Sequence, residues 1–430
     1  MTAQNQRVLS AAETGFEEAF AATHGKQSDG LGEARRAAMA RFEATGLPHR
    51  RIEEYHYTDL KAKLRSAFAL SAKAEIVAPG AVGEVETQGR LVFVNGRFDA
   101  ALSNVEALAG KISVSAWAEE MGAEKAEVQA HGAAAFPRAD ALVDLNTAFV
   151  QGGATITVAG GEKLEKALEI VHVAKGEGAS FSRIDLVVEA GADVLVLESY
   201  QGDSGAYLRN TLTTLEVGDN AKLTWVKLQE EAESATHLAS ATANLGKGAE
   251  LSQFLLDAGS GLSRSQFAVA FNGEGSNAAL RGVSLLKGDS HADITLSVDH
   301  KVPECNSREY FKAIVDDKAR SVFQGQILVK PDAQKTDGQM MVQSLLLSES
   351  AEVNVKPELE IFADDVQCAH GSTTGEIDED LLFYLRARGI PEKEARKILI
   401  LAFLGEVIDE LDDERVGPLL TSRISNWLHV

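Results

Sequence analysis

The sequence predicts a mainly β protein, with a parallel β-helix core flanked by α-helical regions at both ends. From about residue 152, Val, Leu, Ile and Thr alternate with polar residues between turns rich in Gly, Asp and Asn, a pattern typical of short strands. A unit of turn residue, alanine, polar residue and apolar residue also recurs. Its alanines are 29, 28 and 29 residues apart, at Ala192, Ala221, Ala249 and Ala278.

Weaker copies of this unit follow at Ala319 and Ala351, after gaps of 41 and 32 residues. A near-constant period is expected of a β-solenoid, in which each coil buries its face on its neighbours. A sandwich of short strands is the competing fold, but it does not by itself require equal spacing. We therefore place the β-helix core at residues 151–375.

Residues 1–150 are expected to form a helical region with a small β-hairpin. The segment EARRAAMARFEAT (33–45) is rich in helix formers and stops at Gly46. A charged and aromatic connection, GLPHRRIEEYHYTDL (46–60), follows it, and residues 71–90 read as a linker. Asn95-Gly96 within LVFVNGRFDAAL (91–102) is a strong hairpin signal. ADALVDLNTAFV (139–150) predicts a further helix.

Residues 376–430 are expected to be helical. IDEDLLFYLRARGI (377–390) has acids in its first turn, arginines in its last and Gly389 as a stop signal. Pro391 opens a second helix, PEKEARKILILAFLGEVIDEL, and a third runs from about Pro418 to Leu428. The second helix carries an apolar stripe at helical spacing: Ala395, Ile398, Leu399, Ala402, Phe403 and Val407. Part of this stripe should pack inside the molecule, and its width also suggests a partner protein.

Composition excludes several classes of partner. The chain has 430 residues and a formal net charge of -22, which argues against binding nucleic-acid phosphates or an anionic membrane surface. No apolar run reaches the roughly 18 residues of a membrane span, and acidic residues interrupt the N-terminus where a signal peptide needs an apolar core. Two distant cysteines, Cys305 and Cys368, give no disulfide framework. We expect a cytoplasmic protein.

The stretch LEIFADDVQCAHGSTTG (359–375) holds the candidate chemistry. If it is one strand, Asp364, Cys368 and His370 share a face and Asp365 lies on the other. A thiol beside an imidazole can bind iron or zinc, or do nucleophilic work. Two ligands are nevertheless too few for a zinc site, and a buried cysteine is commonly a small hydrophobe. Both interpretations stay open on the residues alone.

Other catalytic apparatus is missing from the sequence. There is no GxxxxGK[ST] loop, GxGxxG, GxSxG, HExxH or CxxC motif. His291 and His300 are expected to be structural, and Cys305 has no nearby base to activate it. An enzyme built on a β-helix, such as a carbohydrate-active protein, is a weaker alternative, because Asp364 and Asp365 would lie on opposite faces.

Long strings in the last third of the chain resemble the SufB/SufD family of iron–sulfur cluster assembly. They are HKVPECNSREYFKAIVDDKARSVFQGQILV, QKTDGQMMVQSLLLS and KPELEIFADDVQCAHGSTTGEIDEDLLFYLRARGI. The segment GLPHRRIEEYHYTDL also resembles the family's N-terminal GLPxRRxExWxYT signature, with Tyr55 and His56 in place of Trp and, usually, Lys. The resemblance implies a right-handed parallel β-helix between helical termini.

Two features favour the SufD branch over the SufB branch. Ala369 and Gly371 flank His370 where SufB typically has Glu on both sides, and Leu385 stands where SufB typically has a cysteine. The strings CNSR (305–308) and KTDGQM (335–340) also look like SufD.

The resemblance implies a non-catalytic scaffold subunit of the SufBCD complex. In that family, SufD pairs with SufB through the β-helices, and the C-terminal helices dock the ATPase SufC, which hydrolyses the ATP. His370 would face a SufB cysteine as a transient ligand of iron or of the nascent iron–sulfur cluster, with Cys368 as neighbouring thiol. Ile398 and Phe403 would help to form the SufC dock. A SufB-like homodimeric scaffold is the alternative, and association of reduced flavin with the complex stays open.

Overall fold

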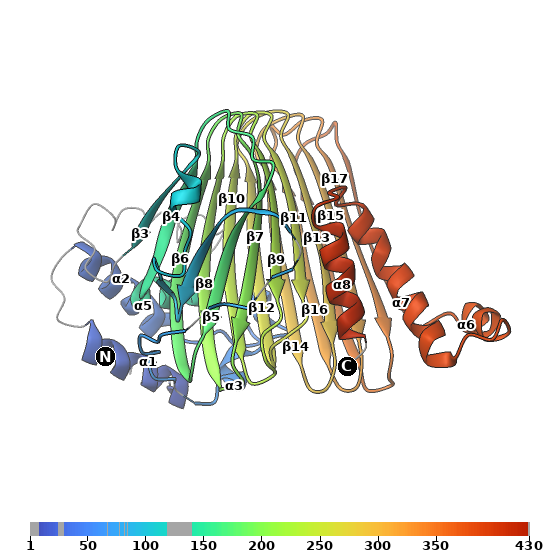
Figure 1. Cartoon of the computed structure of the whole chain (residues 1–430), viewed down its shortest axis with the longest axis horizontal. Coiled ribbons are helices and arrows are strands. Elements are labelled where there is room, and N and C mark those ends of the chain that lie inside the picture. The colour runs from blue at the N-terminus through green and yellow to red at the C-terminus, as the bar shows by residue number, and fades with distance from the viewer. Residues whose placement is uncertain are drawn as a thin grey trace, which may run out of the picture.

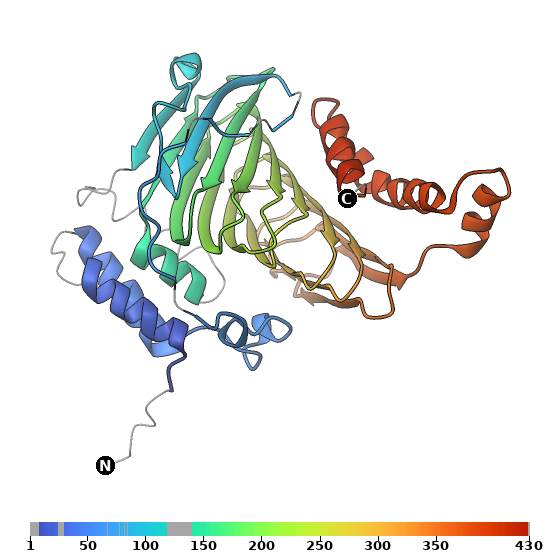
Figure 2. The ribbon, with the colours of Figure 1, turned by 60° about the horizontal axis from the view of Figure 1, so that its bottom comes forward.

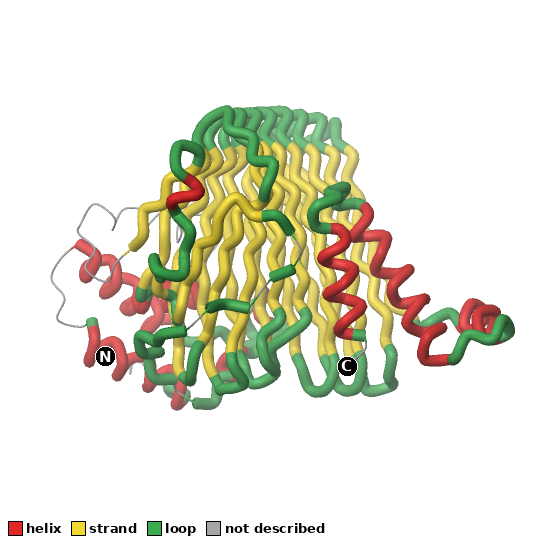
Figure 3. Tube along the Cα trace, in the orientation of Figure 1, coloured by secondary structure: helices red, strands yellow, loops and turns green. Residues whose placement is uncertain are grey.

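A parallel β-solenoid flanked by helices makes up most of the molecule (Figure 1), which confirms the predicted fold class. The computed structural model describes residues 8–24, 30–66, 68–76, 78–80, 82–83, 85–117 and 140–428. Beyond β4 the chain alternates between two sheets, so that each coil contributes one strand to each sheet. Turns stack at both ends of the strands (Figure 3).

The two sheets are named here by their strands. Sheet I contains β1 (Thr87–Val94), β2 (Arg97–Phe98), β5 (Ala167–Ala174), β7 (Asp193–Gly202), β9 (Lys222–Gln229), β11 (Glu250–Asp257), β13 (Asn277–Leu286), β15 (Asn306–Val315), β17 (Asp337–Leu346) and β19 (Gln367–Gly375). Sheet II contains β3 (Ile112–Trp117), β4 (Gly152–Val158), β6 (Gly178–Val188), β8 (Tyr207–Val217), β10 (Thr236–Leu245), β12 (Leu262–Phe271), β14 (His291–His300), β16 (Arg320–Val329) and β18 (Glu352–Ile361).

The repeat is real, but the alanine series does not follow one position of it. Ala192, Ala221 and Ala249 each precede the first residue of a sheet I strand and align across β7, β9 and β11. Ala278 instead pairs with Leu251, two positions further along. Ala319 precedes β16, so it lies in sheet II. The alanines lie at or just inside the starts of strands of either sheet, and the gap of 41 residues before Ala319 reflects the change from sheet I to sheet II.

The N-terminal helices pack on the outer face of sheet II near the starts of its strands. They are α1 (Ala11–Thr23), α2 (Gly30–Thr45) and α5 (Ala141–Phe149), with the short η1 (Glu53–Tyr55) and α3 (Leu60–Lys63) between α2 and the solenoid. The rings of Phe149 and Phe181 stack with centroids 5.2 Å apart, and Phe16 contacts both. This apolar cluster fastens the helices to β6 and its neighbours.

The predicted hairpin at Asn95-Gly96 is confirmed. Both residues have positive φ, 49° and 79°, as the tight turns of hairpins require. The hairpin joins β1 to β2, and β1 also pairs in parallel with β5, so the hairpin begins sheet I. Residues 77, 81 and 84 of the expected linker lie outside the described residues, as does residue 139 of the helix expected at 139–150.

The C-terminal helices are α6 (Glu379–Arg386), α7 (Glu392–Asp409) and α8 (Gly417–Trp427). Residues of α7 and α8 pack on the outer face of sheet I in one apolar cluster. α6 stands away from the solenoid beyond the end of α7 (Figure 2). A small η2 turn (Glu106–Leu108) completes the described elements. None of the described helices is long and apolar enough to cross a membrane.

Candidate functional site

The last coil leaves one end of the solenoid open. β18 and β19 are the outermost strands of their sheets, and no described strand pairs with their free edges. Neither strand has a buried residue, unlike β15, β16 and β17, which precede them. Apolar side chains are exposed here as well, with Phe362 61% exposed and Met341 and Ile361 each 40% exposed. The open end therefore presents unpaired backbone beside apolar surface.

The prediction of one strand through the stretch 359–375 is wrong. β18 ends at Ile361, a turn follows, and β19 begins at Gln367. Asp364 and Asp365 lie in this turn, where the Asp365 carboxylate forms an ion pair with Lys335. Side-chain alternation holds only within one extended segment, so the corner separates Asp364 from the face that carries Cys368.

Cys368 and His370 lie on the same face of β19. Cys368 pairs in register with Gly338 of β17, and His370 pairs with Met340. The Met340 side chain is buried in the core between the sheets, so both residues continue an inward-facing column. Cys368 is half-buried against that core, whereas His370 is exposed because no coil follows.

The surroundings of Cys368 disfavour a thiolate. Burial raises the pKa of this thiol; the backbone N–H of Gly338 lowers it in part, and the charges of Asp337 and Glu309 raise it further. The thiol is therefore protonated near neutral pH. A bound cation would be needed to hold it as a thiolate, the form that binds metal.

A buried polar layer lies beneath the open end, on β15. Glu309 is only 1% exposed, and neither carboxyl oxygen makes a hydrogen bond. Burial raises the pKa of Glu309 to about 8. Ser307, two residues earlier on the same face, hydrogen-bonds to Nε2 of His300 at 3.1 Å. The sequence argument missed Glu309, although the alternation Ser307, Glu309, Phe311 places an acid on an apolar face.

His291, His300 and Cys305, the other candidates considered in the sequence, have structural roles. The His300 ring stacks on Phe271 with centroids 4.2 Å apart, and burial lowers the pKa of His300 to about 4. His291 Nε2 lies 2.9 Å from Oγ1 of Thr58. Cys305 is fully buried, with Sγ 3.4 Å from Oγ of Ser276. No group of three or more potential metal ligands occurs in the part of the chain that is described, so Cys368 and His370 supply at most half of a four-coordinate site.

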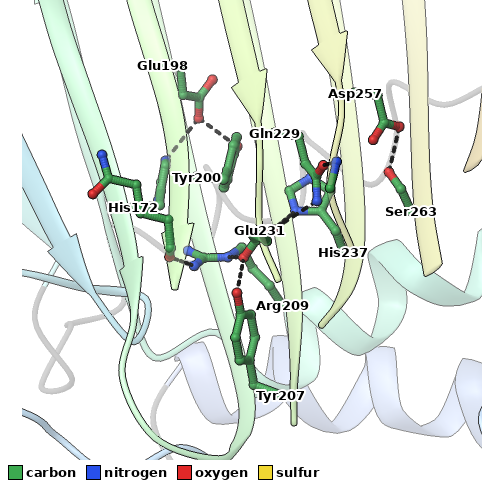
Figure 4. A network of polar contacts seen from close by, with 12 residues as sticks. His172, Glu198, Tyr200, Tyr207, Arg209, Gln229, Glu231, His237, Asp257 and Ser263 are labelled. Atoms are coloured by element: carbon green, nitrogen blue, oxygen red, sulfur yellow. Dashed lines mark hydrogen bonds and ion pairs between the residues drawn. The ribbon is translucent and has the colours of Figure 1, made fainter. Parts of the chain in front are cut away.

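A second buried network lies inside the solenoid (Figure 4), on earlier coils that include β5 and β7. Glu198 accepts hydrogen bonds from Tyr200 (2.8 Å) and pairs with His172 (2.9 Å). Burial alone would raise the pKa of Glu198, but the His172 hydrogen bond and the charge of Lys227 outweigh it and lower the pKa to about 2. A charged carboxylate held in this way stabilises the fold. We assign no chemistry to the network.

Helix α7 buries a different face from the predicted stripe. Ala395 and Val407 are buried as expected, but Ile400, Leu404 and Ile408 complete the buried set. Ile398 is 43% exposed. Phe403 is half-buried, and Nζ of Lys312 lies 4.2 Å from its ring centroid. The run KILILAF is apolar around the helix, so periodicity did not select the face that meets β13 and β15.

Comparisons with known proteins cover nearly the whole chain. The family model described as "SUF system FeS cluster assembly, SufBD core domain" matches residues 171–403, and "SufBD protein N-terminal region" matches residues 13–170. The chain is 32% identical over 391 residues to the iron-sulfur cluster assembly protein SufD of Escherichia coli, covering 89% of this chain and 90% of that protein. An iron-sulfur cluster assembly SufBD family protein of Synechocystis is 29% identical over 384 residues, covering 85% and 84%. SufD of Bacillus subtilis is 27% identical over 287 residues, covering 66% of each chain.

Proposed function

The chain belongs to the SufBD family of iron–sulfur cluster assembly proteins, and from this premise we propose that it is a non-catalytic scaffold subunit. Its open end pairs with a SufB-type chain, and its C-terminal helices dock the SufC-type ATPase. The observation that carries the proposal is the uncovered last coil, where Cys368 and His370 stand beside unpaired strand edges.

Edge pairing is supported by the length and composition of the open end. β18 has ten residues and β19 has nine, each with one free edge. A second solenoid could continue both sheets by adding its own edge strands. Such pairing would remove the exposed side chains of Met341, Ile361 and Phe362 from water. A partner of the same fold is therefore favoured over a flexible peptide, which would cover only one sheet.

A metal site shared with the partner chain is proposed because this chain supplies only two ligands. Cys368 and His370 point from the same face of β19 toward the place that the partner would cover. Imidazole and thiolate both bind iron, and the partner chain would add the other ligands. The raised pKa of Cys368 means that iron binding must release its proton. His370 is exposed at the uncovered end of the solenoid, so we propose it as the main contribution of this chain.

The test is co-expression with SufB-type and SufC-type partners, followed by anaerobic iron and sulfide analysis of the purified complex. The His370→Ala complex should keep its subunit composition but fail to acquire cluster. Thr373→Ala is the matched control, because Thr373 is exposed on the other face of β19. Normal cluster assembly by His370→Ala would remove the histidine from the mechanism.

Self-pairing of this chain through the same edge is the second candidate, supported by the same exposed apolar residues. Native mass spectrometry with and without the SufB-type chain separates the two. We expect the heterodimer to form at the expense of any homodimer, and Phe362→Asp to weaken both. A homodimer that persists at equal concentrations of both chains would favour the homodimeric scaffold.

Docking of the ATPase is supported by exposed apolar residues on α6 and α7. Leu381, Phe383 and Tyr384 of α6 are 51%, 73% and 52% exposed, and Ile398 of α7 is 43% exposed. α6 also stands away from the solenoid (Figure 2), which leaves this surface accessible. Phe403, the other residue expected in the dock, is partly used in contacts with Lys312.

A pull-down with the SufC-type ATPase tests the dock. Phe383→Asp and Ile398→Asp should each lose the ATPase while the chain stays folded, because both side chains are exposed. Ser422→Asp adds the same charge at an exposed position of α8 and should retain it. Retention of the ATPase by both α6–α7 variants would exclude this surface.

A further inference from the structure

We propose that a cleft beside the N-terminal signature segment binds a small phosphorylated molecule. The cleft has a volume of about 830 Å³, within the usual range for small-molecule sites. One wall is formed by residues 46–65, and the other by solenoid residues near the starts of β10, β12 and β16. Its charged and aromatic lining includes Arg50, His56, Tyr57, Lys63, Arg65 and Arg320.

Three residues of the segment GLPHRRIEEYHYTDL (46–60), Glu54, Tyr55 and Thr58, attach this wall to the solenoid. The Tyr55 hydroxyl donates to Asp140 at 2.6 Å, and the guanidinium carbon of Arg264 lies 3.9 Å from the Tyr55 ring centroid. Thr58 Oγ1 lies 2.9 Å from His291 Nε2. The carbonyl of Glu54 accepts a hydrogen bond from Arg264 at 3.0 Å. These buried contacts account for Tyr55 and Thr58, but not for the cationic residues before and after them, Arg50, Lys63 and Arg65.

The cations in the cleft lack carboxylate partners in most cases. Among the described contacts, Arg50 and Lys63 make no ion pair and no side-chain hydrogen bond, and Arg65 reaches only the carbonyl of Ala62, at 3.3 Å. Arg320 pairs with Glu352 at the edge of the cleft. Three unpaired cations on one wall are notable in a chain with a formal net charge of -22.

Two of the cations in the cleft, Lys63 and Arg320, repel each other. Burial lowers the pKa of Lys63, and the charge of Arg320 lowers it further. A phosphate group between them would replace this repulsion by two attractive contacts, and guanidinium groups match phosphate geometry. The T-shaped ring pair of His56 and Tyr57, with centroids 4.8 Å apart, adds an aromatic surface for the organic part of the ligand.

Two carboxylates limit how much negative charge the cleft accepts. Asp59 caps α3, accepting from the amide of Ala62 at 2.9 Å, and Glu233 lies on the solenoid side. Because Arg320 is already paired with Glu352, three cations face these two carboxylates and leave one net positive charge, which favours an anion with a single phosphate group. A long polyanion would meet the repulsion of these acids and of the net negative charge of the chain. The cleft therefore favours a small ligand.

Isothermal titration of the full chain with phenyl phosphate tests the proposal, with inorganic phosphate as a second probe. We expect saturable binding at low salt, tighter for phenyl phosphate than for inorganic phosphate. Lys63→Gln should weaken binding at least tenfold, and Glu233→Gln should tighten it severalfold. Lys111→Gln removes an exposed charge outside the cleft and should leave binding unchanged.

Each contrary result would overturn the proposal. Absence of phenyl phosphate binding by the wild-type chain would exclude the site. Equal weakening of binding by Lys63→Gln and Lys111→Gln would show that binding depends only on the overall charge of the chain. Tighter binding of an acidic peptide than of phenyl phosphate, with the same dependence on Lys63, would assign the cleft to a protein partner instead. An unchanged Tm of the variants shows that their fold is intact.

Discussion

Replacing Glu309 by glutamine should change how the stability of the isolated chain depends on pH. Burial raises the pKa of Glu309 from 4.5 to about 8 in the folded chain. Between these values the unfolded chain releases this proton while the folded chain keeps it, so stability falls as pH rises. Each pH unit in this window costs about 1.4 kcal/mol. The wild-type chain should thus lose roughly 3 kcal/mol through Glu309 between pH 4.5 and 7.

Glutamine has no proton to release in this range, and it keeps the size of the side chain. The free energy of unfolding of Glu309→Gln, relative to wild type, should therefore rise by roughly 3 kcal/mol from pH 4.5 to 7. For 430 residues this corresponds to about 3 °C in Tm. Differential scanning calorimetry over this pH range measures it, with Glu349→Gln, an exposed site, as control. A constant Tm difference between Glu309→Gln and wild type would refute the reasoning, because the carboxyl would then ionise in the folded chain.

Two further outcomes concern the rest of the solenoid. Glu198→Gln should destabilise the chain by roughly 3 kcal/mol at pH 7, since the folded pKa of Glu198 is lowered from 4.5 to about 2. This difference in stability should vanish as pH falls from 4.5 to 2, so the Tm values of the variant and the wild type should converge. Phe181→Ala should cost about 3–5 kcal/mol in chemical unfolding, because Phe181 is fully buried against Phe149; proteolysis should then release the N-terminal helices first, and uniform cleavage along the chain would contradict this order.

Local patterns were sufficient for the architecture. The turn residues at near-constant spacing predicted stacked coils, and the pair Asn95-Gly96 predicted a turn that needs two positive φ angles. The i, i+2 spacing of Cys368 and His370 predicted a shared face, which holds because both lie within β19. In the last two cases the information resides within a few neighbouring residues, whereas the coil period is read from units 28 or 29 residues apart.

The parts that could not be predicted depend on contacts between distant segments. Asp364 does not follow the side-chain alternation of β19, because the chain turns after Ile361 to pass from sheet II to sheet I. Packing on sheet I determines which face of α7 is buried, because a helix with apolar residues on all sides has no preferred buried face in its sequence. Glu309 is buried only because neighbouring coils stack on both sides of β15, which the residues next to it in sequence do not indicate. The attachment of Tyr55 to Arg264 joins residues 209 positions apart, beyond any local pattern.

Strand β15 belongs to two surfaces because its side chains alternate. Its inner face carries Ser307 and Glu309 beneath the last coil, whereas its outer face carries Lys312, whose Nζ contacts the Phe403 carbonyl at 2.6 Å and the Glu406 carboxylate at 2.5 Å. The Lys312 side chain is fully buried in this attachment. Force applied to α7 would thus be transmitted through one strand to the layer that supports the open end. The stiffness of β15 would then determine how much of a displacement of α7 reaches the open end of the solenoid.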